Sequence, residues 1–233
     1  KGNGISVEDW LNYAPQESLS LFNYQKPRAA KKLYFDVIPR NVDEYFQHLS
    51  AWGSQDIKSR LSNPVWHIHN GNPPNFVPPV SFSLLLNLVS AANASDKNIL
   101  WGFIKRYAPD ANPNDNPTLD CLAGFAVRYY EDFVKPNKVY RKPTDQEFKA
   151  LKDLASELDS ISDYESKDPE ALQTLIFSIG KKYEFENLRN WFKAIYEVCL
   201  GQSQGPRFGS FVSIFGTHET SDLIKSALSR YNK

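Results

Sequence analysis

The chain has 233 residues, of which 41% are hydrophobic and 14% aromatic, and its formal net charge is zero. This composition is typical of a soluble globular protein and excludes an intrinsically disordered one. The longest apolar stretch, residues 80–89, is shorter than the roughly 20 residues that a bilayer requires, and serine and asparagine interrupt it. We therefore expect one large or two small folded domains and no membrane partner.

Two features of the sequence bear on its origin and location. It contains no methionine and opens on Lys-Gly-Asn-Gly, without the apolar segment of a secretion signal. We expect the chain to begin inside a longer natural protein. The two cysteines, Cys121 and Cys199, lie far apart in apolar, helical surroundings. Two are too few for a disulfide framework, so they are expected to be buried thiols in a reducing, cytoplasmic location.

Charge is segregated along the chain although the total is zero. Residues 26–40 carry a local excess of four positive charges, and residues 128–142 an excess of three. Residues 143–170 carry nine acids against three lysines. Such blocks can present a basic stripe to a polyanion while another face repels it. They are equally compatible with ordinary solvated helix faces.

The first part of the chain predicts short helices and two strands. Helices are expected over residues 6–14, where Ser6 begins a capping pattern, over residues 17–24, and from Pro39 onward. Strands are expected over residues 32–36 and 64–69, which are aromatic or alternate apolar and polar residues. Residues 70–79 contain four prolines and predict a loop at a domain boundary.

Everything after this loop has the pattern of helices. Apolar-rich segments at residues 80–93, 96–107 and 117–134 are separated by turns. Five more helices are then indicated. Three begin at expected caps, which are Thr144, Asp168 and Thr217, and two are apolar stripes that end at Gly201 and Gly216. Short links between helices favour a compact helical bundle or cage. The predicted class is mainly α, with parts at residues 1–75, 76–143 and 144–233.

No pattern in the sequence indicates an active site. His67 and His69 would share one face of the expected strand, but no third ligand has suitable spacing. We therefore favour hydrogen-bonded structural histidines and expect no metal site. Phosphate-binding and hydrolase motifs are also absent from the sequence, so no catalytic residue is assigned.

The turn at residues 201–209 is the most informative polar segment. It combines glycines with Gln202 and Gln204 and places Arg207 at the start of the following helix. Exposed backbone amides, side-chain amides and arginine are groups that contact unstacked RNA bases and phosphates. The alternative is a plain helix–helix turn with a surface arginine. The apolar stripes place Phe208 and Trp191 in the core rather than against a base.

Several segments, in order along the chain, resemble class I lysyl-tRNA synthetases. They are WLNYAPQESL, QKPRAAKKLYFDVIPRNVDEYF, NPVWHIHNGNPP, VSFSLLLNLVSAAN, WGFIKRYAP, RYYEDFVKP and GQSQGPRFGSFVSIFG. The resemblance covers essentially the whole chain and is strongest to the bacterial branch of this archaeal-type enzyme. It implies a carboxyl-terminal piece that opens just beyond the family's ATP-binding KMSKS loop.

The family resemblance carries further expectations about fold and activity. Aminoacylation belongs to an amino-terminal Rossmann-like domain with a HIGH signature, which this sequence lacks. The full-length enzyme would join lysine to its tRNA using ATP with Mg²⁺, whereas this piece alone is expected to be inactive and to hold no cofactor. Residues 1–75 would form a small α/β stem-contact region. Residues 76–143 and 144–233 would form an α-helix cage like that of glutamyl-tRNA synthetase, the last part binding the anticodon.

The resemblance also directs the choice of site residues. The basic block is expected to contact the tRNA stem through Lys26, Arg28, Lys31, Lys32 and Arg40. The anticodon is expected to contact Arg207 above all, with Gln202, Gln204, Arg189 and Lys193 as neighbours. Expected partners are the tRNA for lysine and, in the full-length chain, its own catalytic domain, but not DNA. The alternatives are a glutamyl-tRNA synthetase cage and a helical protein-interaction module without an RNA role.

Overall fold

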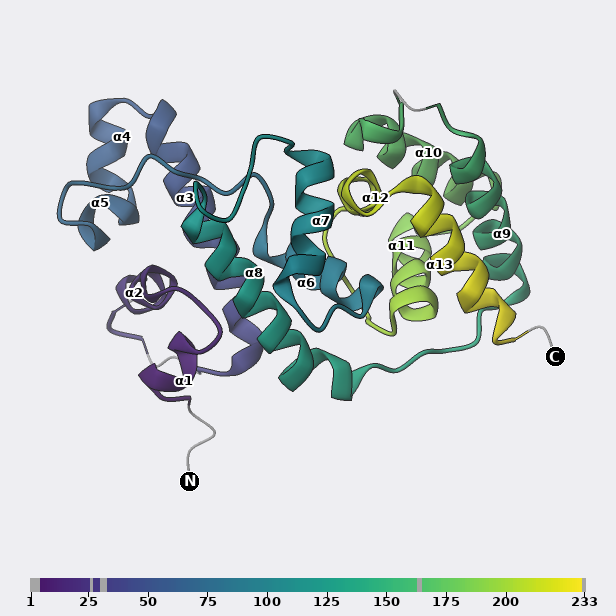
Figure 1. Cartoon of the computed structure of the whole chain (residues 1–233), viewed down its shortest axis with the longest axis horizontal. Helices are drawn as coiled ribbons and strands as arrows, with labels where there is room; N and C mark the ends of the chain where they lie inside the picture. Colours follow the sequence, from purple (N-terminus) through teal and green to yellow (C-terminus); the bar gives the residue numbers. More distant parts are fainter. Residues whose placement is uncertain (1–4, 26, 30–32, 163–164, 232–233) are drawn as a thin grey trace.

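The computed structural model describes residues 5–25, 27–29, 33–162 and 165–231. Within these ranges the chain forms helices and no strand, which confirms the mainly α class. Figure 1 shows the helices in three groups along the long axis of the molecule, in chain order from the amino-terminal end. In the same ranges, no helix combines the length and the apolar character that crossing a bilayer demands.

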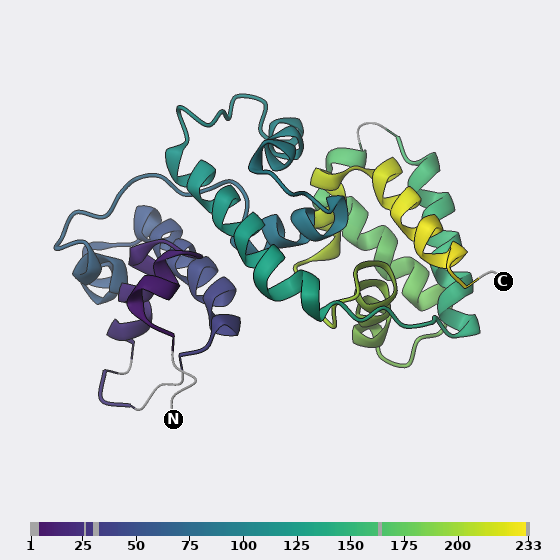
Figure 2. The same ribbon diagram turned by 60° about the horizontal axis from the view of Figure 1, so that its bottom comes forward.

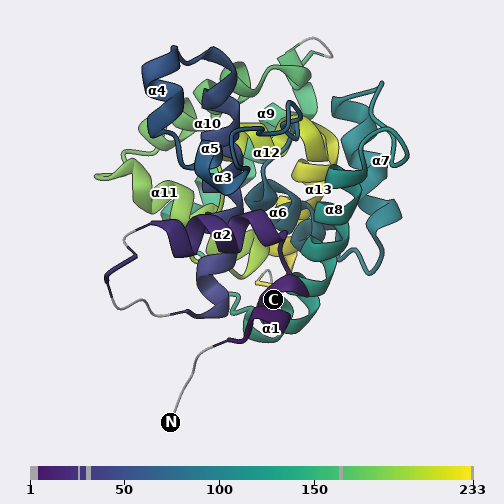
Figure 3. The ribbon, with the colours of Figure 1, turned by 90° about the vertical axis from the view of Figure 1, so that its left-hand side faces the viewer.

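The first group is amino-terminal and lies in front of the others when the molecule is viewed from that end (Figure 3). It consists of α1 (Val7–Leu11), α2 (Gln16–Tyr24), α3 (Ile38–Ser54), α4 (Ile57–Ser62) and α5 (Pro64–Ile68). The expected capping box at Ser6 is present, because the Ser6 side chain accepts from the Asp9 amide and the Asp9 carboxylate accepts from the Ser6 amide. A small core of its own joins α2, α3 and α5 through Leu21, Tyr45, Leu49 and Val65.

Both predicted strands in this group are wrong. Residues 35–37 form a 3-10 turn that leads directly into α3, whereas Lys32 lies outside the described residues. At residues 64–69 the side chain of Asn63 accepts from the Val65 amide at 3.1 Å, and Pro64 occupies the first helical turn. A cap followed by proline starts a helix. These local signals outweigh the alternating pattern, and the predicted α/β character of the region is not observed.

The second group surrounds a deeply buried helix. It comprises α6 (Phe82–Ala92), α7 (Lys97–Tyr107) and α8 (Pro117–Tyr129), and a π turn, Tyr130–Val134, extends α8. The start of α6 is held by the carboxylate of Asp43 from α3, which accepts from the amides of Phe82 at 2.6 Å and Ser83 at 3.1 Å. This carboxylate satisfies helix donors that have no partner within α6, and it ties the first group to the second.

The third group forms the carboxyl-terminal bundle. Its helices are α9 (Asp145–Ser160), α10 (Pro169–Lys182), α11 (Leu188–Ile195), α12 (Phe208–Phe215) and α13 (Thr217–Ser229), and a π turn, Tyr196–Leu200, extends α11. The turned view in Figure 2 shows α8 running between this bundle and the amino-terminal group. The expected caps at Thr144 and Asp168 are present. Thr217 is instead the first residue of α13, and its side chain does not cap the helix.

Core predictions are mostly confirmed. Trp191 and Phe208 are 0% and 1% exposed, and Cys199 is buried. Cys121 is exposed, so the prediction that both thiols are buried is wrong. It lies on α8 beside Leu122, which faces the core, and adjacent helix positions point in different directions. Cys121 therefore lies on the solvent-facing side of α8, although its neighbour Leu122 is in the core.

A connector without regular structure, residues 138–144, joins the second group to α9 (Figure 1). Its first residue, Lys138, donates to the Ser90 carbonyl at 2.9 Å and lies over the rings of Tyr130 and Tyr140. Further along, Arg141 donates to both Glu147 and Glu197. The carboxylate of Glu147 is the larger cause of a raised Arg141 pKa. These contacts fix the connector against both groups.

We predict that Asp43→Ala lowers the free energy of unfolding by about 1–3 kcal/mol, because buried amides at the start of α6 lose their acceptor. Urea denaturation would measure the change. Asp36→Ala is the matched control, since Asp36 is exposed and its side chain makes no hydrogen bond within the described ranges, and should change stability by less than about 0.5 kcal/mol. Equal midpoints for both variants and the parent would contradict a stabilising role for Asp43.

A second prediction concerns pH. Burial, helped by Arg230, lowers the pKa of Lys138 from its ordinary 10.5 to about 8. Between these values the unfolded chain binds more protons than the folded one, so the contribution of Lys138 to stability rises with pH. The stability difference between the parent and Lys138→Met should therefore shift in favour of the parent as the pH rises from 8 to 10.

Comparing the stability of the parent with that of Lys138→Met cancels the titration of Cys199, which both proteins contain. Burial raises the pKa of the Cys199 thiol to about 12, so this group lowers stability as the pH rises. Chemical denaturation at several pH values would give the difference. A difference that does not vary with pH would show that Lys138 titrates alike in the folded and unfolded chains.

Candidate functional site

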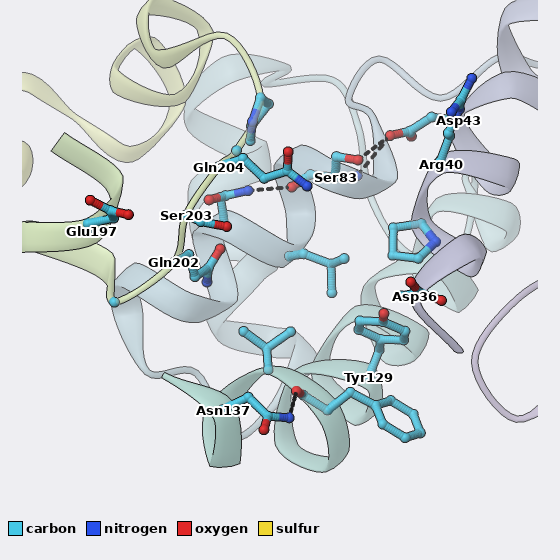
Figure 4. A pocket seen from close by; sticks show the side chains of 18 of the residues that line it. Asp36, Arg40, Asp43, Ser83, Tyr129, Asn137, Glu197, Gln202, Ser203 and Gln204 are labelled. Atoms are coloured by element: carbon cyan, nitrogen blue, oxygen red, sulfur yellow. Dashed lines mark hydrogen bonds between the residues drawn. The ribbon is translucent and has the colours of Figure 1, made fainter. Parts of the chain in front are cut away.

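A cavity of about 1080 Å³ lies where the amino-terminal group meets the carboxyl-terminal bundle. Its walls come from α3, α6, the end of α8 with its π turn, and the turn at residues 201–206. Figure 4 shows the side chains of this turn opposite those of α3 across the hollow. Polar side chains that line the cavity include Asp36, Arg40, Asp43, Glu44, Ser83, Asn137, Arg141, Glu197, Gln202, Ser203 and Gln204.

The turn at residues 201–209 is held in place by close packing. Gly201 ends the preceding π turn with φ +68°, which favours glycine. A side chain at Gly205 would collide with the Tyr196 ring, 2.1 Å from the Cβ position. The Tyr196 hydroxyl donates to the Pro206 carbonyl, and the Gly209 amide donates to Gln173 at 2.8 Å. The turn therefore presents its side chains from a defined position.

Two π turns border the same cavity. The one after α8 contributes Phe133 and Val134, and the one after α11 contributes Glu197. Single π turns are uncommon and occur frequently at functional sites, because they shift the side chains that follow them out of helical register. Their convergence from two distant parts of the chain supports this cavity as a functional site.

The cavity lining is more acidic than basic. Asp36, Asp43, Glu44 and Glu197 provide four carboxylates, and burial raises the pKa of Asp43. Of the two arginines in the lining, Arg141 is held by Glu147 and Glu197. Arg40 makes no ion pair within the part of the chain that the structure describes. Phosphates are therefore favoured near Arg40 and disfavoured beside the carboxylates, which can accept hydrogen bonds from neutral groups with N–H donors.

The structure brings together three residues from both predicted groups. Arg40, expected at the tRNA stem, lines the same cavity as Gln202 and Gln204, expected at the anticodon. Gln202 is positioned by its amide, which donates to the Ser90 hydroxyl at 2.7 Å. The stem and anticodon roles of these residues stay predictions.

Arg207 does not line this cavity. Its guanidinium turns toward α10, where both carboxylate oxygens of Glu170 accept from it, one of them at 2.6 Å. The hydrogen bond to Glu170 raises the pKa of Arg207. The guanidinium reaches Glu170 because Arg207 directly precedes α12, which packs along α10. Arg207 borders a second, smaller hollow on the far side of the turn.

The remaining predicted site residues lie elsewhere. Arg189 and Lys193 are exposed on α11 and do not line the cavity. Lys193 is 3.5 Å from Glu197, which does line it. Arg28 is exposed and outside the cavity. Lys26, Lys31 and Lys32 lie outside the described residues.

The two histidines do not share a strand face. His67 lies in α5, where its Nε2 is 3.0 Å from the Leu61 carbonyl and its ring stacks on Tyr24. His69 follows the helix, and its Nε2 is 2.9 Å from the Tyr45 hydroxyl. Both therefore have structural hydrogen-bond partners, as predicted. Within the described ranges no three His, Cys, Asp or Glu side chains cluster as metal ligands would.

Several cavity residues were not predicted from the sequence. Asp43, Ser83 and Asn137 come from three different elements, and no local pattern connects them. The spacing of Gly201, Gly205 and Gly209, four residues apart, was a visible signal for the packed turn. It indicated close backbone approach at that segment, but not the partner elements that the turn would meet.

The first 72 residues match the family model described as tRNA synthetases class I (K). The whole chain is similar to known lysine–tRNA ligases. It is 55% identical to that of Roseobacter denitrificans over 228 residues, 97% of this chain and 42% of the relative. For the Rickettsia conorii protein the identity is 49% over 230 residues, 98% of this chain and 44% of the relative. For that of Rickettsia felis it is 49%, covering 98% and 43%.

The chain thus spans less than half the length of these relatives. The similarity nevertheless runs through nearly all of this chain, including the helices and the turn that enclose the cavity. The chain belongs to the class I lysyl-tRNA synthetase family.

Proposed function

We propose that this chain is the tRNA-binding, carboxyl-terminal half of a cytoplasmic lysine–tRNA ligase, and that it recognises the anticodon of the tRNA for lysine. The observation that carries the proposal is the cavity that unites Arg40 with Gln202 and Gln204. Sequence identity to lysine–tRNA ligases along the whole chain supports the choice of tRNA.

The charge distribution supports recognition of base edges inside the cavity. Four carboxylates in the lining oppose entry of the phosphate backbone. Unstacked bases of an RNA loop can enter and be read by hydrogen bonds on their edges. Gln202 and Gln204 offer both amide donors and carbonyl acceptors from a fixed turn, and such groups complement a uridine-rich anticodon. Arg40, on α3 at the cavity rim, is placed to neutralise a phosphate and to fix the position of the RNA loop.

Contact with the anticodon would act on a reaction elsewhere in the full-length enzyme. Binding energy released at a remote site can orient the acceptor end and discriminate among tRNAs. Joining lysine to tRNA with ATP and Mg²⁺ is assigned to the catalytic domain in the remainder of the full-length chain. The acid-rich cavity does not fit a triphosphate, and the described residues offer no metal cluster. This chain alone is therefore expected to be inactive.

We predict that the chain binds lysine tRNA more tightly than the same tRNA with a swapped anticodon. Fluorescence anisotropy at two salt concentrations would measure both affinities. Gln202→Ala and Gln204→Ala should each reduce the preference about 2- to 10-fold, the effect of one lost hydrogen bond of roughly 0.5–1.5 kcal/mol. Arg40→Ala should instead weaken both tRNAs alike and lower the salt slope by about one.

Matched controls lie on exposed helix faces away from the cavity. Gln16→Ala on α2 and Lys152→Ala on α9 should leave both affinities unchanged. Equal binding to both tRNAs by the parent would assign discrimination to another part of the enzyme. Absence of binding would contradict the proposed function itself.

A separate prediction concerns Arg207 and Glu170. Because Glu170 already occupies the guanidinium, a phosphate must displace a carboxylate before it gains this contact. Arg207→Ala should therefore weaken tRNA binding only about 2- to 5-fold and lower the salt slope by about one. Glu170→Gln should strengthen binding at low salt. The same titrations measure both, and equal weakening by the two variants would show that the pair acts only on folding.

A further inference from the structure

A second hollow, of about 270 Å³, lies on the other side of the turn from the large cavity. Pro206 lines both spaces, so the turn forms the wall between them. The hollow is bounded by α7 and α12, which pack together, and by the start of α6. Its lining residues are Pro79, Val80, Ser81, Leu84, Tyr107, Pro206, Arg207, Ser210, Ser213 and Ile214.

Among the described residues, the lining of this hollow contains no carboxylate, unlike that of the large cavity. Arg207 is the only ionised side chain at neutral pH among the described residues that line it. The carboxylates of Glu170 hold the guanidinium at the rim, yet Glu170 itself does not line the hollow. An anionic group at the mouth must compete with the Glu170 carboxylate for this cation, but it meets no acidic side chain among the described lining residues. The small hollow therefore suits a phosphorylated ligand whose phosphate displaces Glu170 from Arg207.

The hollow also presents polar groups that the fold leaves unused. Within the part of the chain that the structure describes, no hydrogen bond occupies the hydroxyl of Tyr107 or that of Ser210. By contrast, Ser81 caps α6 and Ser213 donates to the Ser210 carbonyl. Tyr107 is 42% exposed although its ring is large and apolar. Free hydroxyls beside an exposed ring favour a ligand with a flat face and a polar edge.

Size narrows the class of ligand. Pockets for drug-sized molecules span about 300–1,000 Å³, so a volume of about 270 Å³ suits a single small ring system rather than a stretch of chain. Two prolines, Pro79 and Pro206, add flat apolar surface to the tyrosine ring. A nucleobase meets these requirements, because every base has a face that stacks on aromatic side chains.

We propose that this hollow binds one unstacked nucleotide of the tRNA anticodon loop, with its base packed against Tyr107 and its phosphate near Arg207. The inference rests on the proposed function and adds a second recognition site to it. The loop would straddle the turn, with base edges read in the large cavity on one side and one base stacked in the hollow on the other. Tyr107 is then a binding residue whose contribution depends on its ring.

The test uses a fluorescently labelled anticodon stem-loop of lysine tRNA and the whole chain. Tyr107→Leu removes the ring and should weaken binding about 5- to 100-fold, the range for a lost base stack. Tyr107→Phe keeps the ring and should bind within about threefold of the parent. Phe177→Leu is the control, since Phe177 is 37% exposed on α10 and does not line the hollow. Circular dichroism melts verify that each variant is folded.

Stem-loops with a single abasic nucleotide separate stacking from a structural effect. If the base at one position occupies the hollow, its removal and Tyr107→Leu should give losses that do not add, because they delete the same contact. Losses that add at every position, or a Tyr107→Leu affinity within twofold of the parent, would overturn the assignment of the hollow.

The two proposals fail in distinguishable ways. If the parent still prefers the lysine stem-loop over an anticodon-swapped one while Tyr107→Leu has no effect, only the hollow assignment is overturned. If the parent shows no such preference, the proposed function fails, and the assignment of the hollow fails with it.

Discussion

The carboxylate of Asp43 at the start of α6 holds the two walls of the large cavity together. Asp43 belongs to α3, yet its carboxylate accepts hydrogen bonds from the amides of Phe82 and Ser83 in the next group of helices. Arg40 lies one helical turn before it on the same helix, and both residues line the cavity. This contact is one of several that join the amino-terminal group to the remaining helices, and it also sets where a cation stands at the cavity rim. One ion-to-helix interaction thus contributes both to stability and to the proposed recognition.

The turn at residues 201–209 divides two environments of opposite character. On one side, four carboxylates and two glutamines line a large cavity; on the other, Arg207 and free hydroxyls border a small hollow. Close packing of Gly205 on Tyr196 keeps the wall thin and fixed. Because only the large cavity is lined by carboxylates, the proposed RNA loop would place its bases there and keep its phosphates near Arg40 and the Arg207–Glu170 pair.

Local signals in the sequence were sufficient for most helices and insufficient for the strands. The capping box at Thr144 and the cap at Asp168 involve residues only two or three positions apart, so the sequence contains all of their partners. The strand predicted at residues 64–69 failed because an alternating pattern is weaker evidence than the Asn63 cap and Pro64 at its start. The aromatic segment before α3 forms a 3-10 turn at residues 35–37 instead of a strand. Exposure of Cys121 likewise depended on which face of α8 the other helices cover, which no pattern within that helix states.

From the sequence alone we could predict the family, the helical class, the glycine-rich turn at residues 201–209 and the burial of Trp191 and Phe208. Each of these depends on composition, on similarity along the chain or on periodicities within one helix. The packing of the helices was needed to show that Arg40 meets Gln202 and Gln204, and that Arg207 turns away to Glu170. More than 160 positions separate Arg40 from the turn, and their meeting follows from how α3, α6 and α12 pack. A side chain's partners across such distances are set by the packing of whole helices, which local sequence does not encode.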